Sequence, residues 1–457
     1  MPYVEGFGTW PFGEEWLWEA ITSSYLPLLG LLEAGAPLTL SLTPVLCDQL
    51  EGDGVAERYR AFLDVVRRHT HHEDARGLRA GGHDALSDEV LRSWGDYERA
   101  LLRFAELDGD LLGALAPYAQ WTSSATHAVL PLLATDAGLD AQVTTGIDSH
   151  RARFGRVGAD WRGGFWLPEC AHAPWLEPTL ADAGVHASCV ELTNAFGPDS
   201  PRHLQPLLGD AGVRLVPIDR ATMSLVWSDS GYPAHRDYRD YHHHTIHHHN
   251  PWANHGGGYD HARALALARA HAVDFVARTR ARLERLGGGL PGGGLAVCAL
   301  DTELLGHWWY EGGAWLSYVV EECASQGLEL VRLDDALERF EPAPAAGVWR
   351  DPEQVSTWGE HGDLSTWSSP VVAEMAFAIR AAELAAERAG SGLGPAGLRQ
   401  LLALQSSDWA FMVSRGLAVP YARQRFDEHR QGLSDALCQG RDASVGPLRN
   451  LAVHARL

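Results

Sequence analysis

Short apolar runs alternate with stretches of helical apolar spacing along most of the chain. Seven runs are candidate strands, and several of them are almost continuously apolar, as expected for strands that are covered on both faces. They lie at residues 38–46, 142–146, 164–168, 187–191, 214–218, 295–300 and 328–333. This alternation of strands and helices predicts an α/β fold built on a parallel sheet or a barrel.

Three regions depart from the alternation. Residues 54–116 have helical spacing and predict a helical subdomain inserted between the first two strands. From residue 370 onward the pattern is helical, over 371–389, 395–415 and 420–437, which predicts a separate helical domain. Residues 228–259 are polar and rich in turn residues, and a loop of this length inside a compact domain is usually functional or disordered.

The composition narrows the classes of function. The formal net charge is −22, and the sequence contains Arg but no Lys. The absence of Lys excludes Schiff-base chemistry and a phosphate-binding loop lysine. The acidic balance argues against nucleic-acid and anionic-membrane partners and suits a neutral substrate.

Cysteine usage and the N-terminal pattern predict the compartment. The six cysteines are scattered and form no C-x-x-C pair, which is typical of a reduced protein. The N-terminal stretch lacks a basic region followed by an apolar one, and no run reaches the ~18 apolar residues of a membrane span. We therefore expect a cytoplasmic protein without a secretory signal.

Two acidic residues follow apolar runs at positions where barrel enzymes carry their chemistry. Glu169 comes directly after Pro168 at the end of one run, and Asp301 ends another, with Glu303 two residues later. In such barrels the catalytic residues lie at the C-terminal ends of strands. On spacing alone, Glu169 could equally be a structural carboxylate at the start of a helix, where the helix dipole stabilises its negative charge.

Tryptophans accompany these acids. The chain has 17 tryptophans, and His307 and Trp308 follow the second acid closely. Trp358 and Trp367 bracket a polar, glycine-containing loop. Many tryptophans will be core residues, but clusters beside carboxylates are typical of grooves that bind sugar rings. A pair of carboxylates on separate strand ends is what cleavage of a glycosidic bond requires.

Five motifs in order along the chain resemble glycoside hydrolase family 57, in the branch of the 1,4-α-glucan branching enzymes. They are A-T-H-x-x-x-P at 125–131, W-x-P-E-C-A at 166–171, D-T-E-L-x-G-H-W-W at 301–309, S-x-W-G-E at 356–360 and Q-S-S-D-W at 405–409. Each motif alone is modest, but their shared order covers nearly the whole chain.

The resemblance implies a fold and a reaction. The fold would be a (β/α)7 barrel over residues 1–340, with the helical insertion at about 54–116 and a catalytic loop at about 228–259. A helical domain over 347–457 would contribute Trp358 and Trp367 to the cleft. The resemblance further implies that Glu169 is the nucleophile and Asp301 the general acid/base of a retaining reaction that cleaves α-1,4 linkages and forms α-1,6 linkages.

The resemblance also implies the ligands. The partners would be donor and acceptor α-1,4-glucans of a glycogen-like kind, and neither a metal nor an organic cofactor is expected. The implied substrate-binding residues are His127, which would lie near the sugar that is attacked, and Trp10, Trp166, Tyr232, Tyr238, His307, Trp308, Trp358 and Trp367.

Two departures from the family pattern keep alternatives open. The family has a first strand ending in H-x-H ahead of the stretch that matches Pro2–Val4, whereas this sequence begins at Met1. Family members also carry a loop tyrosine that favours a sugar acceptor over water. Tyr232 and Tyr238 are the candidates here, but the histidine-rich residues 242–249 do not follow the family pattern. An α-glucan hydrolase or a 4-α-glucanotransferase on the same site is therefore the alternative.

The histidines permit further hypotheses. Residues 242–249 contain six histidines and could bind a metal, as a metal-dependent carbohydrate hydrolase or deacetylase would. A solvated loop with incidental metal affinity is the preferred interpretation. The smaller cluster of His69, His71 and His72 is expected at the surface. A glycan-binding protein without activity is the remaining class.

Overall fold

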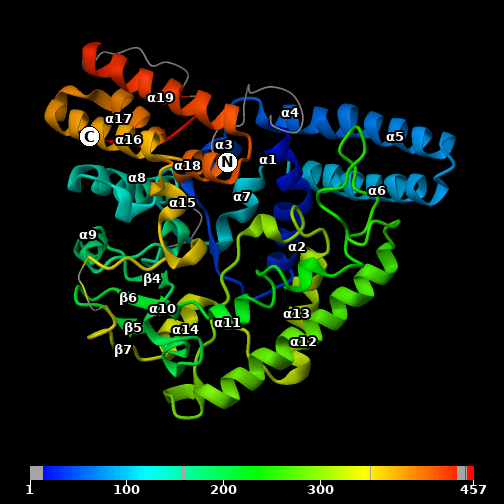
Figure 1. Ribbon diagram of the computed structural model, residues 1–457, viewed down its shortest axis with the longest axis horizontal. Helices are drawn as coiled ribbons and strands as arrows, with labels where there is room; N and C mark the ends of the chain where they lie inside the picture. The colour runs from blue at the N-terminus through cyan, green and yellow to red at the C-terminus, as the bar shows by residue number, and fades with distance from the viewer. Residues whose placement is uncertain are drawn as a thin grey trace.

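The computed structural model describes residues 14–155, 161–349, 351, 353–439, 448 and 450–456 (Figure 1). Its strands form a three-stranded and a four-stranded sheet. The first has the order β1-β2-β3, all parallel, with β1 at Leu40–Ser41, β2 at Ala119–Ser123 and β3 at Phe165–Trp166. The second has the order β4-β6-β5-β7, with β4 at Ala187–Val190, β5 at Leu207–Leu208, β6 at Arg214–Pro217 and β7 at Ala343–Pro344.

The two sheets join into one curved wall. A parallel bridge between Gly164 and Ala187 connects the first sheet to β4, which pairs in parallel with β6. Beyond β6, the backbone N–H of Asp219 donates to the carbonyl oxygen of Val297 at 2.8 Å. The parallel course β1-β2-β3-β4-β6 and the segment beside it form the incomplete barrel that the sequence predicts. Every residue of β4 is buried, which explains its unbroken apolar pattern.

The predicted strands at 164–168, 187–191 and 214–218 contain β3, β4 and β6, and the run at 38–46 contains β1. The prediction at 142–146 is wrong, because these residues belong to helix α8, Asp136–Phe154. A segment of five residues that includes the β-branched Val143, Thr144 and Thr145 is too short for periodicity to separate a strand from a helix. The predictions at 295–300 and 328–333 are wrong, because residues 295–300 and 328–332 carry no regular secondary structure and Leu333 begins α14; β2, β5 and β7 were not predicted.

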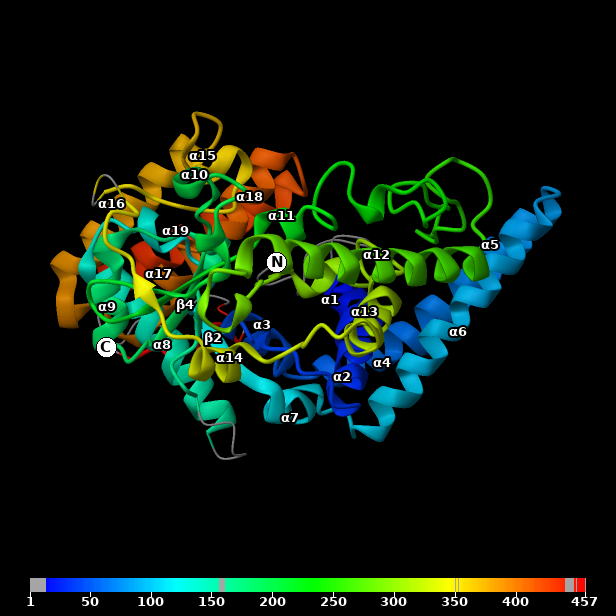
Figure 2. The ribbon, with the colours of Figure 1, turned by 90° about the horizontal axis from the view of Figure 1, so that it is seen from below.

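The predicted helical insertion is present. It consists of α4 (Val55–Ala61), the π-helical segment η2 (Phe62–Arg67), α5 (Arg68–Ala80), α6 (Asp84–Glu106) and α7 (Leu111–Leu115). Helices α5 and α6 project from the body of the molecule (Figure 2). The insertion packs on the N-terminal helices α1 (Glu15–Ala20) and α2 (Leu26–Glu33) and on the π-helical segment η1 (Ile21–Tyr25). In this contact the ring of Tyr59 from α4 stacks on that of Trp18 from α1, with 5.9 Å between the centroids.

The barrel part of the chain contains further helices. They are α3 (Pro44–Leu50), α9 (Glu177–Asp182), α10 (Thr193–Phe196), α11 (Arg220–Met223), α12 (His261–Gly287), α13 (Gly312–Gln326) and α14 (Leu333–Arg339). In the described residues, no helix combines the length and apolarity needed to cross a membrane.

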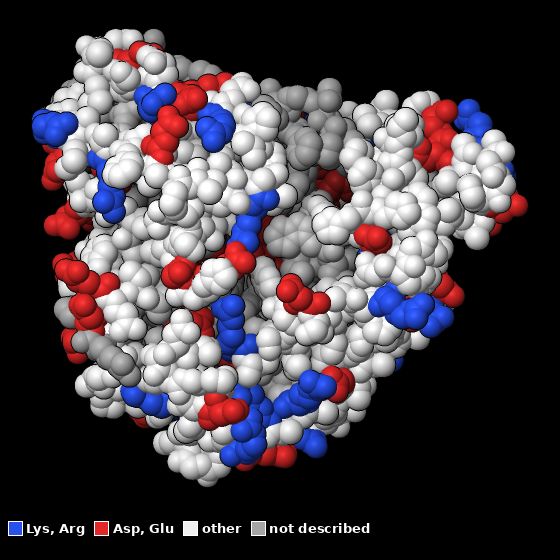
Figure 3. All heavy atoms as spheres, viewed as in Figure 1, with Lys and Arg blue, Asp and Glu red and all other residues white. Residues whose placement is uncertain are grey.

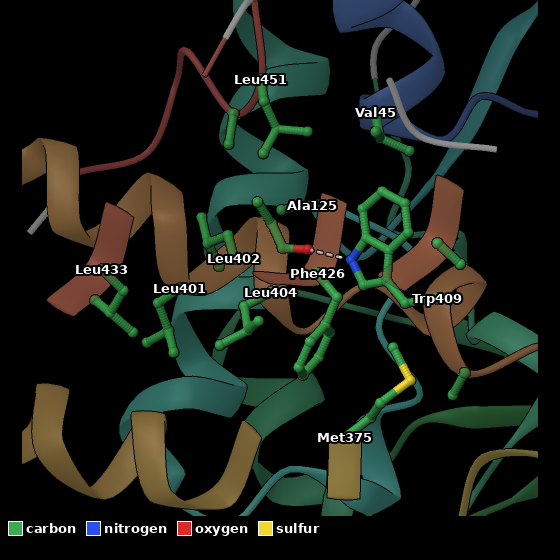
Figure 4. Close-up of a cluster of buried hydrophobic side chains, with 14 of the residues drawn as sticks. Val45, Ala125, Met375, Leu401, Leu402, Leu404, Trp409, Phe426, Leu433 and Leu451 are labelled. Atoms are coloured by element: carbon green, nitrogen blue, oxygen red, sulfur yellow. Dashed lines mark hydrogen bonds between the residues drawn. The ribbon is translucent and has the colours of Figure 1, made fainter. Parts of the chain in front are cut away.

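The C-terminal helices share a core with the barrel. They are α15 (Ser365–Ser368), α16 (Ala373–Ala389), α17 (Gly394–Leu404), α18 (Ser407–Arg415) and α19 (Val419–Gln439). Figure 4 shows Trp409 in this core, with its Nε1 donating to the carbonyl oxygen of Ala403 at 2.8 Å. Val45, Ala125 and Ala171 of the barrel belong to the same cluster, so these helices are fixed against the barrel. The single helix expected at 395–415 is broken between α17 and α18.

Candidate active site

Glu169 lies on a strained turn directly after β3. Its φ is 59° and that of Cys170 is 50°, so two successive residues with side chains adopt the left-handed conformation. Such residues cost about 1–3 kcal/mol each and persist where the surroundings enforce them. Here the carbonyl oxygen of Glu169 accepts hydrogen bonds from Thr357 Oγ1 at 2.7 Å and from the backbone N–H of Trp358 at 3.2 Å. The segment at 357–358 therefore holds the turn in place.

The Glu169 carboxylate is held by a tryptophan. Trp358 Nε1 donates to Glu169 Oε2 at 2.9 Å. Burial raises the pKa of Glu169, and the nearby His127 and the Trp358 hydrogen bond lower it. The hydrogen bond fixes the direction of the carboxylate and stabilises its charged form.

Asp301 has the more strongly perturbed carboxyl group. Burial raises its pKa well above the usual range, and the charges of Glu303, Glu169 and Asp408 raise it further. Glu303 accepts a hydrogen bond from the Tyr25 hydroxyl. Because Asp301 is destabilised as an anion more than Glu169, the pair favours a protonated Asp301 beside an ionised Glu169.

His127 and Asp408 reach the site from other elements. His127 has a φ of 59°, and its Nδ1 shares a hydrogen bond of 2.9 Å with Ser407 Oγ at the start of α18. Asp408, the next residue of α18, is close enough to raise the pKa of both Glu169 and Asp301. Asp408 lies in the Q-S-S-D-W motif at 405–409 but was not predicted as a site residue.

Three tryptophans form a wall beside Glu169. The Trp358 ring lies 4.9 Å from that of Trp166 and 5.7 Å from that of Trp227, measured between centroids. Arg220 Nη1 donates to the carbonyl oxygen of Trp358 at 3.0 Å and fixes the loop. Trp227 was not predicted as a site residue, although it begins the polar segment that was expected to be functional.

The other predicted residues lie in different surroundings. His307 and the exposed Trp308 line a large cavity next to the turn of Asp301. Trp367 is 4% exposed within the C-terminal core. Tyr238 is fully buried against His271, whose Nδ1 lies 2.8 Å from its hydroxyl, and Tyr232 donates to Asp274. Trp10 lies outside the described residues.

The histidine-rich residues 242–249 are ordered against the insertion, with Figures 1 and 2 showing this part of the chain beside α5. Asp74 of α5 binds His247 Nδ1 at 2.6 Å and accepts a hydrogen bond from Thr245. His249 is 3% exposed and His71 is completely buried, with their ring centroids 3.8 Å apart. The prediction of a surface position is therefore wrong for His71, and the prediction of a solvated loop holds for the exposed residues 242–244 but not for His249, which is buried against His71.

Neither metal nor nucleic-acid chemistry gains support from the side chains. Within the described ranges, no group of three or more His, Cys, Asp or Glu side chains is placed to hold a metal ion. On the face in Figure 3, uncharged residues predominate, and acidic and basic side chains lie scattered between them. A nucleic-acid interface would instead gather its basic side chains in one stripe or patch.

Comparisons with known proteins agree on one family. The model of glycosyl hydrolase family 57 matches residues 121–346, and the model of the C-terminal region of 1,4-alpha-glucan branching enzymes matches 379–445. A probable 1,4-alpha-glucan branching enzyme of Mycobacterium tuberculosis is 31% identical over 96% of this chain and 91% of its own length. One from Thermococcus kodakarensis is 28% identical over 93% of this chain and 70% of its own length.

Solved structures show the same likeness. The crystal structure of a family 57 branching enzyme from Pyrococcus horikoshii has a TM-score of 0.84 and 29% identity, and covers 95% of this chain and 88% of its own. An α-amylase from Thermotoga maritima has a TM-score of 0.78 at 24% identity, covering 96% of this chain and 91% of its own, and shows the shared fold.

Proposed function

The chain belongs to glycosyl hydrolase family 57, and on that premise we propose that it is a retaining 1,4-α-glucan branching enzyme. The observation that carries the proposal is the pairing of Glu169 with Asp301: burial raises the pKa of both carboxyl groups, the charge of Glu169 raises that of Asp301 further, and His127 and the Trp358 hydrogen bond oppose the rise at Glu169. A double displacement needs one ionised carboxylate and one carboxylic acid. The match of residues 379–445 to the C-terminal region of branching enzymes supports transfer rather than simple hydrolysis.

In the first step, the Glu169 carboxylate attacks the anomeric carbon of an α-1,4 linkage. Asp301 gives its proton to the departing glycosidic oxygen, so the bond between carbon and that oxygen breaks as the bond to Glu169 forms. In the second step the ionised Asp301 takes the proton of a 6-hydroxyl on the acceptor chain. That oxygen then displaces Glu169 and forms the α-1,6 linkage with retention of configuration.

The neighbouring residues position these groups. Trp358 orients the Glu169 carboxylate through its indole N–H, and His127, anchored by Ser407, stands close to the same carboxylate. We assign the faces of Trp166, Trp227 and Trp358 to stacking against the sugars of the donor chain.

The remaining predicted binding residues take several roles. We assign His307 and Trp308 to the acceptor side of Asp301. Trp367, Tyr232 and Tyr238 support the loops from within the core, as their burial and hydrogen bonds favour. Trp10 remains a candidate for sugar stacking.

The organisation and location are part of the same proposal. We assign catalysis to residues 1–340 and a supporting role to the helical part at 347–457, which brings Ser407 and Asp408 to the carboxylates. The six cysteines form no disulfide, which favours a cytoplasmic location. The partners are donor and acceptor chains of an α-1,4-glucan.

The test counts two products from amylose. New α-1,6 linkages are measured by proton NMR and new reducing ends by a colorimetric assay, with Glu169→Gln as the inactive control. Many linkages with few reducing ends are the expected result. Reducing ends without branches would make the chain an α-glucan hydrolase, and redistribution of chain lengths without branches would make it a 4-α-glucanotransferase.

A further inference from the structure

We propose that the large cavity between the helical insertion, α1 and the histidine-rich residues binds the acceptor glucan chain during transfer. This inference rests on the proposed function and assigns it a second binding region. The cavity has a volume of about 1000 Å³. This lies at the upper end of the roughly 300–1,000 Å³ of small-ligand sites and gives room for an oligosaccharide.

The cavity adjoins the acid rather than the nucleophile. Its residues Trp308 and His307 donate their backbone N–H groups to the carbonyl oxygen of Glu303, at 3.0 and 3.2 Å. Glu303 and Asp301 belong to one turn, η10 and its preceding residue. An acceptor must approach from the side of the group that deprotonates it, and this turn forms the boundary between that group and the cavity.

Aromatic rings make up part of the wall. The ring of His307 meets Trp16 at 5.5 Å and Tyr241 at 5.9 Å, both edge to face. Tyr241 is 43% exposed and Trp308 is 37% exposed, so both offer ring surface to a ligand. Exposed aromatic faces in a concave site are suited to stacking against sugar rings.

Most charged side chains that line the cavity are in ion pairs. Arg67 pairs with Glu19 at 3.0 Å and Arg99 pairs with Asp96. Arg239 pairs with Glu89, which does not itself line the cavity. Burial lowers the pKa of the lining histidines His71, His249 and His307, to about 4 for His307, so these three imidazoles are neutral at pH 7. A wall of paired charges and neutral rings suits an uncharged polyhydroxylated ligand better than a phosphate or a nucleotide.

Two substitutions test the cavity from opposite directions. Tyr241→Ala removes an exposed ring. Gly313→Leu fills space, because a Cβ at Gly313 meets its nearest neighbours, Leu305 O and Pro27 Cβ, only at 3.9 Å. Tyr318→Ala is the matched control, since Tyr318 lies on α13 against Arg269 and does not line the cavity.

The assay varies the concentration of a labelled maltoheptaose acceptor at fixed amylose donor. Both cavity variants should raise the half-saturating acceptor concentration by about tenfold, the scale of one lost aromatic contact. Fluoride release from α-maltosyl fluoride, which needs no acceptor chain, should change by less than about twofold. Circular dichroism confirms that each variant is folded.

The outcomes separate this inference from the proposed function. If the wild-type chain branches amylose and neither cavity variant changes the acceptor dependence, the cavity assignment is overturned and the proposed function stands. If the wild-type chain forms no branches, maltoheptaose binding is followed by tryptophan fluorescence. Weaker binding to Tyr241→Ala and Gly313→Leu than to Tyr318→Ala would then still support the cavity, and equal binding would overturn it.

Discussion

The hydrogen bond from Trp358 to Glu169 should set the lower pH limit of activity. Trp358→Phe keeps an aromatic ring against Trp166 and Trp227 but removes the Nε1–H that donates to Glu169 Oε2 at 2.9 Å. Burial already raises the pKa of Glu169, and this hydrogen bond opposes that rise. Without it the pKa rises further, so a higher pH is needed to ionise the nucleophile.

The size of the effect follows from the strength of the bond. A hydrogen bond to a charged group contributes about 1.5–3 kcal/mol, and about 1.36 kcal/mol corresponds to one pH unit. The acid limb of kcat/KM should therefore move to higher pH by about 1–2 units, with water in the vacated space favouring the smaller value. At pH values well above the acid limb, kcat/KM should change much less.

The measurement is the pH profile of kcat/KM for α-maltosyl fluoride hydrolysis, whose leaving group needs no proton. Trp227→Phe is the control, because Trp227 contacts the Trp358 ring but donates no hydrogen bond to Glu169 in the described structure. Since Glu169 and Asp301 titrate as a coupled pair, the limb reports an apparent pKa of the pair. A folded Trp358→Phe protein with an unmoved acid limb would refute the reasoning.

Other substitutions test the remaining assignments. Glu169→Gln should lower amylose turnover by about 10⁴-fold or more without unfolding the protein, and near-normal turnover would exclude Glu169 as the nucleophile. Asp301→Asn should slow amylose cleavage far more than fluoride release from α-maltosyl fluoride, so equal losses on both substrates would argue against proton donation by Asp301. Tyr238→Phe should lower the free energy of unfolding in urea by about 1 kcal/mol through the lost bond to His271, and a midpoint no different from that of Tyr318→Phe would contradict this estimate.

The elements that were predicted correctly are those whose own residues show the apolar pattern of a strand or a helix. The run at 187–191 has a buried, mostly apolar pattern and contains strand β4, and the helical spacing at 420–437 lies within helix α19. The error at 142–146 has a physical reason. Gln142 and Thr145 are buried because α8 lies between the barrel and the C-terminal helices, so polar residues on its buried side interrupt the apolar spacing by which a helix is recognised.

The residues of the candidate site also differ in whether the sequence alone indicates them. Glu169 and Asp301 are candidates from the sequence alone, because each follows an apolar run and lies in a motif of the family, and in the structure the charge of Glu169 acts on Asp301. Asp408 and Trp227 could not be placed, since their approach depends on where α18 begins and on how the segment after α11 folds back onto Trp358. Burial also reverses the expectation for His71, whose polar neighbours His69 and His72 in the sequence suggested exposure.

Transfer and hydrolysis share their chemistry up to the last step, which limits where selectivity can arise. In the proposed mechanism, water and a sugar 6-hydroxyl both lose a proton to Asp301, and both displace the same carboxylate of Glu169. These two residues therefore cannot choose between the acceptors. The choice depends on groups that hold a sugar hydroxyl near the glycosylated Glu169 before water reaches it. The cavity beside the Asp301 turn is the part of the described structure suited to that task. Variants that alter it should therefore change the ratio of branches to reducing ends, whereas variants of the carboxylates should lower both products together.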